Sequence, residues 1–467
     1  MKSPVGKKVL ALAAGVLVLM LGLGRIEEVV RDRAHHRTLA TQAVSQSLAG
    51  AQTLLGPLLH VACVESWDVW QGADLDRKLV ELRRESSYVL PPTELSVEGN
   101  ATPLVLQRGL YPVPTYLLNS QLQARWDQLE ALRPAPTQKN SRLQCGAPIL
   151  MVAVTDTRGV RSARLTTLGQ ERMLKPGTFH GVYKQGLHAQ LPDAVRHQTE
   201  PLQVRLDLEL AGTEQLSIVP LGEQTDIHIQ SSWPHPSFGG YFLPSSREVR
   251  TDGFEARWRL SALATSAAQD VVESKPLCAW SWSEGGASED MEASRVENCV
   301  QSVRLRLIDP VNPYTLTNRA TKYGLLFVAL TFVAVGLVEL LQRRAVHPVQ
   351  YLLVGSALSA FFLLLLSLSE HMSFAKAYAV ASAACVTLLG YYAAHMLGRL
   401  WRGVLLGLGI AALYGVLFVL LRLEQTALVV GAVALFAVLA SIMVLTRKVD
   451  WYGLGQAPAA SDAGALK

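Results

Sequence analysis

Charged residues are scarce in this sequence: they make up 17% of the 467 residues, and the formal net charge is only +5. Lys and Arg form no long basic tract, and no basic patch alternates with aromatic residues. These absences argue against a protein that binds nucleic acid. Half of the residues are hydrophobic, and many of them are concentrated in a few long runs. This pattern is typical of a membrane protein.

Motifs for cofactors and for catalysis are also missing. The sequence has no Walker loop, no G-x-S-x-G nucleophile elbow and no H-E-x-x-H. None of the cysteines forms a C-x-x-C pair, so no zinc-like spacing is present. Gly285-Gly286 lacks the strand and helix context that phosphate binding needs. We therefore predict no cofactor, no metal and no catalytic residue.

Six apolar runs are long enough, or nearly so, to cross a membrane as helices. About 20 apolar residues span the hydrocarbon core, which is about 30 Å thick. The runs are each nearly free of charge, and they cover residues 9–23, 323–341, 350–368, 377–397, 403–421 and 427–445. The sequence therefore predicts an N-terminal anchor and a C-terminal five-helix bundle.

The positions of the cations predict the orientation of these spans. Cations cluster at four places that all lie on one side of a six-span chain: Lys2, Lys7 and Lys8; Arg343 and Arg344; Arg399 and Arg402; Arg447 and Lys448. Because short cytoplasmic loops are enriched in Lys and Arg, both termini are predicted to be cytoplasmic and residues 25–322 to be exported. A cleaved signal peptide is the alternative for the first run.

The segment between the first two spans is predicted to be rich in β-strands. Residues 204–210, 226–230, 254–260 and 303–307 alternate apolar and polar side chains, as half-buried strands do, and residues 149–154 read as a more buried strand. Antiparallel sheets of a β-sandwich are the architecture that we expect. The Ser-, Ala- and Glu-rich stretch 264–294 is predicted to be an exposed loop.

Four of the five cysteines lie in the exported segment: Cys63, Cys145, Cys278 and Cys299. An even number on the oxidising side of a membrane indicates two disulfides. Local pairing favours Cys278 with Cys299, which leaves Cys63 with Cys145. Buried free thiols are the alternative.

Several blocks of the sequence resemble the CreD family of bacterial inner-membrane proteins. The resemblance runs from the first span to about Tyr452 and is carried by Ser232–Phe238, Phe242–Pro244, Arg247–Val249, Asn318–Tyr323, His347–Gly355, Leu368–His371 and Thr446–Tyr452. It implies a role in cell envelope integrity, linked to the CreBC two-component response, to colicin tolerance and to the β-lactam response. It implies a process, and no enzymatic reaction.

Two places are candidate interaction sites. Trp233 and His235 lie in a segment stiffened by two prolines, which is either a recognition loop or a rigid turn whose tryptophan fills the core. Glu370 and His371 follow an apolar run abruptly at the exported end of the third span. They either dock the exported domain, with Glu370 directed at Lys376 or Lys322, or form a solvated loop.

The full expectation is an α+β membrane protein with four parts. These are an N-terminus with the first span (1–24), a periplasmic β-rich domain (25–322), a five-helix bundle (323–446) and a cytoplasmic tail (447–467). We predict a non-enzymatic scaffold or sensor that contacts the lipid bilayer and periplasmic envelope or cell-wall partners. The rival is a transporter, or a membrane-embedded enzyme, for a lipid-linked envelope precursor; it needs a polar cavity in the bundle.

Overall fold

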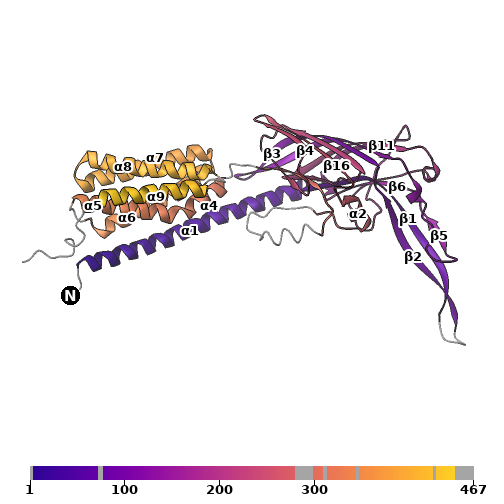
Figure 1. The fold of residues 1–467 in the computed structure, drawn as a ribbon, viewed down its shortest axis with the longest axis horizontal. Helices are drawn as coiled ribbons and strands as arrows, with labels where there is room; N and C mark the ends of the chain where they lie inside the picture. Colours follow the sequence, from indigo (N-terminus) through magenta and orange to yellow (C-terminus); the bar gives the residue numbers. More distant parts are fainter. Residues whose placement is uncertain are drawn as a thin grey trace, which may run out of the picture. The chain divides into compact units, whose positions relative to one another are not determined.

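The computed structural model describes residues 4–71, 77–278, 298–308, 313–342, 346–423 and 427–447 (Figure 1). Its contacts divide the chain into two compact units. The helical unit contains Met1–His36 and Val311–Lys467, and the β unit contains Arg37–Pro310. The predicted tail from residue 448, the Arg343–Arg344 pair and residues 279–294 of the predicted loop lie outside the described residues.

Helix α1 (Pro4–Ser47) begins in the helical unit and ends in the β unit without a break. Its C-terminal end is held within the β unit by Arg158, whose guanidinium donates hydrogen bonds to the backbone carbonyls of Gln46 and Ser45. Carbonyls at a helix C-terminus lack intrahelical partners, so a cation is favourable there. Asp156 orients Arg158 through an ion pair of 2.7 Å and also accepts a hydrogen bond from the Gly50 amide.

The described part of the β unit contains a nine-stranded sheet built around the long strand β1. The main path of neighbouring strands is β14 (Pro236–Gly240), β17 (Val303–Leu307), β12 (Gln215–Ile218), β1 (Gln52–Gln71), β6 (Ile149–Val154), β10 (Gly186–Gln190) and β9 (Lys175–Pro176). Two further strands, β2 (Lys78–Leu90) and β5 (Arg142–Cys145), pair with β1 off this path.

The second sheet in the described residues has eight strands. Their order is β15 (Ser246–Arg250), β16 (Gly253–Ser261), β13 (Gln224–Ser231), β3 (Glu94–Arg108), β4 (Tyr111–Trp126), β11 (Leu202–Thr213), β7 (Val160–Thr167) and β8 (Gln170–Arg172). One core joins the two sheets, because buried side chains such as Leu58 of β1 and Leu122 of β4 belong to the same cluster. Short helical segments lie between strands: η2 (Glu130–Leu132), η3 (Thr157–Gly159), η4 (Asp193–His197) and α2 (Ala267–Val272).

All five predicted strands are confirmed, since they lie within β11, β13, β16, β17 and β6. The prediction of antiparallel sheets was wrong in part. The pairs β1–β12 and β3–β13 are parallel, so each sheet is mixed. The predicted loop also needs a correction, because residues 267–272 form α2, with Ala267, Asp270 and Val271 buried.

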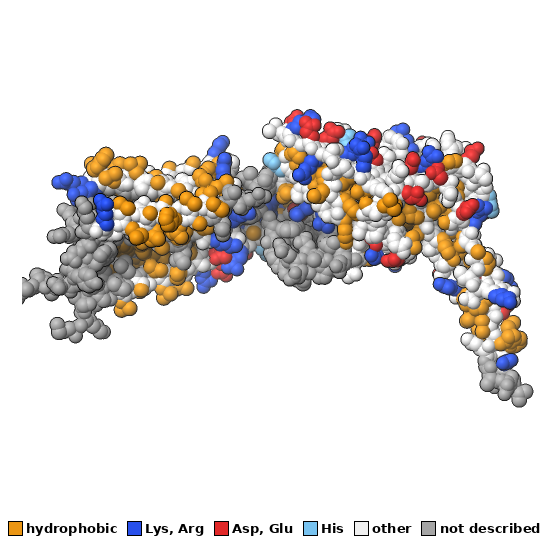
Figure 2. Space-filling model, viewed as in Figure 1, with side chains coloured by type: hydrophobic (Ala, Val, Ile, Leu, Met, Phe, Trp, Pro, Cys, Tyr) orange, Lys and Arg blue, Asp and Glu red, His pale blue; other side chains and the backbone are white. Residues whose placement is uncertain are grey.

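The helical unit continues after the β unit with α4 (Pro313–Lys322), α5 (Gly324–Gln342), α6 (Pro348–Ser369), α7 (Phe374–Leu397), α8 (Leu400–Arg422) and α9 (Ala427–Thr446). Among the described residues, α6, α7 and α8 are long and apolar enough to cross a membrane, and α4 with α5 makes a fourth if that bent pair is one span. The predicted spans 9–23 and 427–445 lie on α1 and α9, which are not among these. Hydrophobic side chains cover most of the visible described surface of this unit (Figure 2).

Close contact between α7 and α8 depends on small residues. A Cβ atom on Gly403 would lie 2.5 Å from Cα and Cβ of Ala394. One turn further along, a Cβ on Gly407 would lie 3.5 Å from Cα of Gly390. Small residues four positions apart allow two membrane helices to approach closely and gain van der Waals contact.

Candidate functional site: the polar face of the eight-stranded sheet

One face of the eight-stranded sheet is polar across most of its width. In β3 the residues alternate, with Leu95 and Val97 buried in the core and Glu94 and Ser96 on the opposite face. The same alternation in the neighbouring strands places polar residues side by side, because residues opposite each other in a sheet lie on the same face. We call this surface the polar face.

Four rows of side chains, each running across the strands, define the polar face. The rows follow from the register of β16, β13, β3, β4, β11 and β7. They are Ser261, Gln224, Glu94, Arg125 and Gln203; then Arg259, Asp226, Ser96, Gln123, Arg205 and Thr166; then Arg257, His228, Glu98, Gln121, Asp207 and Arg164; then Glu255, Gln230, Asn100, Asn119, Glu209 and Ser162.

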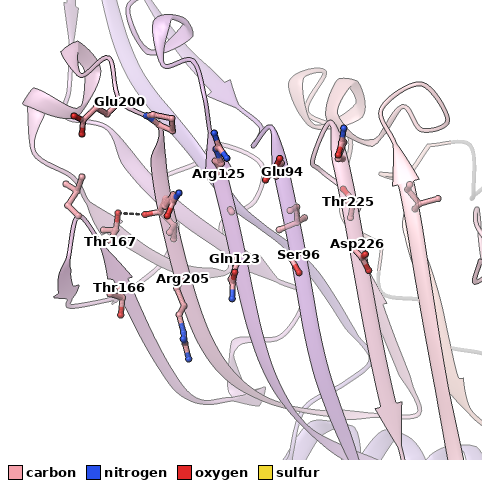
Figure 3. A pocket seen from close by; sticks show the side chains of 18 of the residues that line it. Glu94, Ser96, Gln123, Arg125, Thr166, Thr167, Glu200, Arg205, Thr225 and Asp226 are labelled. Carbon is pink, nitrogen blue, oxygen red and sulfur yellow. Dashed lines mark hydrogen bonds between the residues drawn. The ribbon is translucent and has the colours of Figure 1, made fainter.

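The first two rows line a groove of about 1250 Å³. Figure 3 shows their side chains on adjacent strands, with Gln123 near the middle and Arg205 and Asp226 on either side of it. The described lining consists mainly of carboxylate, guanidinium, amide and hydroxyl groups. Such a surface can hold an extended ligand by many hydrogen bonds, and its aliphatic parts add apolar contact.

Charges on the polar face are largely neutralised by neighbouring side chains. Arg257 and Asp226 are 2.6 Å apart, Arg205 and Asp207 are 3.3 Å apart, and His228 lies 2.8 Å from a Glu255 oxygen. Hydrogen bonding to Asp226 raises the pKa of Arg257. Exposed pairs of this kind stabilise a fold little, but they fix the directions of side chains. The polar face is therefore an ordered array of donors and acceptors with little net charge.

Both predicted disulfides are present in the structure. Cys63 of β1 is bonded to Cys145 of β5, and these residues are direct cross-strand partners. Cys278 is bonded to Cys299. The fifth cysteine, Cys385, is a buried free thiol in α7.

Trp233 and His235 lie away from the groove. The Trp233 ring is partly buried against the β core, and its indole N–H donates to the carbonyl of His235 at 3.1 Å and to that of Ile308 at 3.0 Å. The turn is thus tied to the residue that follows β17. Ligand binding by this segment stays a prediction.

Glu370 and His371 follow the C-terminus of α6 and do not share a partner. A Glu370 carboxylate oxygen lies 3.7 Å from the Arg33 guanidinium of α1, and the Glu370 side chain is only 9% exposed. The ring of His371 is exposed and contacts the Ser367 carbonyl at 3.2 Å. Arg33 is a partner that the sequence did not suggest, in place of Lys376 or Lys322. Docking of the β domain at this position stays a prediction.

One cavity between the described helices is small. The cavity bounded by residues of α5 to α8 has a volume of about 10 Å³, and its lining is apolar apart from the Tyr392 hydroxyl. Near the end of α5, Glu339 accepts a hydrogen bond of 2.8 Å from Tyr351. His347 caps α6, where its ring accepts from the Val349 amide. Among the described residues, no group of three or more His, Cys, Asp or Glu side chains is arranged to hold a metal ion.

The groove was missed by reasoning from sequence, although one signal for it was present. Strict alternation in residues 204–210 and 226–230 marks two strands that each have a polar face. Nothing local in the sequence shows that β13 pairs with β3, which comes more than 100 residues earlier in the chain. The rows exist only because of such long-range pairing.

Comparison with known proteins agrees with the membrane character of the chain. A family model described as "Inner membrane protein CreD" matches residues 4–452. The inner membrane protein CreD of Escherichia coli strain K12 is 33% identical over 455 residues, which is 97% of this chain and 95% of that protein. These matches cover both units.

Among solved structures, the similarity is weak. An M1 zinc metallopeptidase of Deinococcus radiodurans bound to a Tyr-Ser-Ala substrate has a TM-score of 0.18 and 11% identity, over 36% of this chain and 38% of that one. Another structure of the M1 zinc metallopeptidase of this organism gives 0.16 and 10%, over 36% and 38%. Such low scores carry no assignment of fold or activity. The sequence matches show the family: the chain belongs to the CreD family of inner membrane proteins.

Proposed function

We propose that the protein is a non-enzymatic scaffold or sensor that supports cell envelope integrity and takes part in the envelope-stress or β-lactam response. In this proposal the β domain contacts periplasmic envelope or cell-wall partners through its polar face. The observation that carries the proposal is the groove of about 1250 Å³, lined by two complete rows of polar side chains on paired strands. Sites on regular strands hold their side chains more accurately than sites on loops.

The topology that we propose places both termini in the cytoplasm and residues 25–322 in the periplasm. Six spans accomplish this, with α1 and α9 added to α4–α5, α6, α7 and α8. Support comes from the cations beside four of the span ends, including Arg399 and Arg402 between α7 and α8. Exposed apolar side chains on α9, such as Phe436 at 72% and Val433 at 62%, fit contact with lipid.

A transporter or a membrane-embedded enzyme is the alternative. Such a protein needs ionisable side chains that face a water-filled cavity inside the bundle. The cavity between α5 and α8 is small and mostly apolar, unlike the site that the alternative needs. Glu370 and His371, the best candidates for the alternative, follow the end of α6, and Glu370 is near Arg33.

The test blocks the groove with one bulky side chain. Gln123 lies in the middle of a row, so Gln123→Trp should obstruct the groove without changing the buried face of β4. Gln190→Trp, at an exposed position on β10 of the other sheet, is the matched control. We expect both variants to accumulate normally in a strain that lacks the chromosomal gene, and only Gln123→Trp to lose at least half of the protection against detergent or β-lactam. Full protection by Gln123→Trp at normal protein levels would show that the groove has no role in this process.

A further inference from the structure

Three histidines are brought together at one buried place in the β unit. His60 of β1 and His188 of β10 come from the nine-stranded sheet, and His180 comes from the segment before β10. His60 is completely buried, and His180 and His188 are 6% and 5% exposed. The ring centroids of His60 and His180 are 5.8 Å apart. Buried imidazoles in contact are uncommon enough to need an explanation, and none of the three lines the groove.

The segment 177–186, which we call the histidine loop, is held together by these rings. The His60 Nε2 atom contacts the Thr178 carbonyl at 2.9 Å, and His188 Nδ1 contacts the Gly177 carbonyl at 2.7 Å. His180 stacks on Tyr183 with centroids 4.7 Å apart. Phe179 has a φ of 58°, a left-handed conformation that is unfavourable for an aromatic residue. The loop therefore stores strain that its contacts must offset.

Hydrogen bonding requires the His180 ring to be neutral, and burial of an unpartnered Nδ1 atom disfavours a second proton on His60. His180 Nδ1 accepts from the backbone amides of Val182 at 3.2 Å and Tyr183 at 3.3 Å, and an acceptor nitrogen cannot carry a proton. His60 donates through Nε2 to a carbonyl, and its buried Nδ1 has no partner among the described residues. A second proton on His180 would thus face two amide donors. A second proton on His60 would be buried without an acceptor. Each case is costly in a buried site.

The charged groups around the loop do not offset such protonation. Lys175 on β9 is the strand partner of His188, and Lys184 lies within the loop. Asp270 is engaged by Lys275 at 2.7 Å, and the backbone carbonyl of Lys275 accepts from the Tyr183 hydroxyl. Within the described residues, no carboxylate is in hydrogen-bonding contact with the three rings. After burial, the charge interactions that act on His60 and His180 come from the neighbouring His188 and His60 rings, and these also disfavour the imidazolium form.

We propose that the histidine loop is an acid-sensitive switch, which is closed over the nine-stranded sheet while His60 and His180 are neutral and opens when they are protonated. Opening breaks the two hydrogen bonds that the backbone amides of Val182 and Tyr183 donate to His180 Nδ1. It also exposes Tyr183, which is only 3% exposed in the closed form. The surface that appears is aromatic, and it lies on a different sheet from the groove. The proposal therefore does not depend on the function of the polar face.

The direction of the pH dependence follows from linkage. Burial and the neighbouring His60 ring lower the pKa of His180 to about 4, and burial lowers the pKa of His60. In an open loop both rings regain an ordinary pKa near 6.5. The closed form is therefore fully favoured above about pH 6.5, and it loses this advantage as the pH falls towards 4. For His180 alone, the opening equilibrium should increase about 50-fold between pH 7 and pH 4.5.

The experiment is hydrogen–deuterium exchange of the full chain in nanodiscs, with protection factors taken for the loop and for β11 as an internal reference. In the wild type we expect the protection of residues 177–186 to fall at least tenfold more than that of β11 between pH 7 and pH 4.5. His180→Asn keeps an acceptor at the position of Nδ1 and cannot be protonated, so its loop should stay protected at the lower pH. His197→Asn, at an exposed position in η4, is the matched control and should respond like the wild type.

A second variant keeps the test decisive if His180→Asn folds poorly. His60→Gln retains a donor near the position of Nε2 for the Thr178 carbonyl and also cannot be protonated. Reduced acid sensitivity in either variant supports the switch. A loop that opens no more than β11 in the wild type, or an unchanged acid response in both variants, would overturn it.

Discussion

Glu65 shows how a single side chain can organise a loop. Its carboxylate accepts four hydrogen bonds, from the Thr137 amide at 2.7 Å, the Thr137 hydroxyl at 2.5 Å, the Gln138 amide at 2.9 Å and the Ser141 hydroxyl at 2.5 Å. These bonds, led by that from Ser141, lower the pKa of Glu65 to about 2. The loop from 137 to 141 is thereby attached to β1 beside the Cys63–Cys145 bond. The sequence could not reveal this, because its donors lie more than 70 residues away.

We expect Glu65→Gln to lower the melting temperature by several degrees and to make residues 137–141 more sensitive to proteases. Glutamine presents one acceptor oxygen, and its amide group would face donors instead of accepting from them. Because the pKa of Glu65 is lowered, its contribution to stability is present above pH 4.5 and is lost as the pH falls towards 2.

Thermal unfolding at pH 7, 5 and 3 measures this difference. Glu85→Gln, an exposed residue on β2, is the control and should melt like the wild type. Equal melting of the Glu65→Gln protein and the wild type at pH 7 would contradict the assigned role of the carboxylate.

Among elements, helices were easier to predict than sheets. The apolar runs 350–368, 377–397 and 403–421 agree with α6, α7 and α8 to within a few residues at each end, because hydropathy is a local property. The alternation of apolar and polar residues located the strands, but it did not predict their order in the sheets. The partners of β1 are β2, β5, β6 and β12, which are distributed over most of the domain. Pairing over such distances leaves no pattern in one sequence.

Packing of α7 against α8 should depend on Gly403. A Cβ at this position would come within 2.5 Å of backbone and side-chain atoms of Ala394, so Gly403→Val should force the helices apart. We expect the amount of protein in the membrane fraction to fall several-fold, together with the melting temperature in detergent.

Gly409→Val is the matched control, because a Cβ on Gly409 meets no atom within 4 Å. Gly409→Val should change neither the amount of protein in the membrane fraction nor the melting temperature in detergent. If the Gly403→Val protein accumulates and melts like the Gly409→Val protein, the close approach of α7 and α8 is not needed for stability.

For the molecule as a whole, the sequence was most informative about its organisation. Two apolar regions flank a β-rich segment, and both disulfides lie in that segment, as the even number of cysteines indicated. It was least informative about the groove, which no single strand contains. The Arg33–Glu370 contact was missed for the same reason, since it joins α1 to the end of α6, more than 300 residues later.

Reporter fusions test the orientation of the whole chain. An enzyme that is active only in the periplasm should be inactive when fused after residue 451, because an even number of spans returns the C-terminus to the cytoplasm. The same reporter inserted at Gly169, in the open turn between β7 and β8, should be active. Strong activity after residue 451 would rule out the six-span topology.

The pairing of β1 has a consequence for biosynthesis. The nine-stranded sheet joins β1, at the start of the β unit, to β12 and through it to β17, the last described strand of that unit. The sheet cannot be completed until the ribosome has made almost the entire domain. Dependence on such distant contacts slows folding and prolongs exposure of unpaired strand edges. A nascent chain of this protein should therefore depend on holding chaperones at the membrane until β17 emerges.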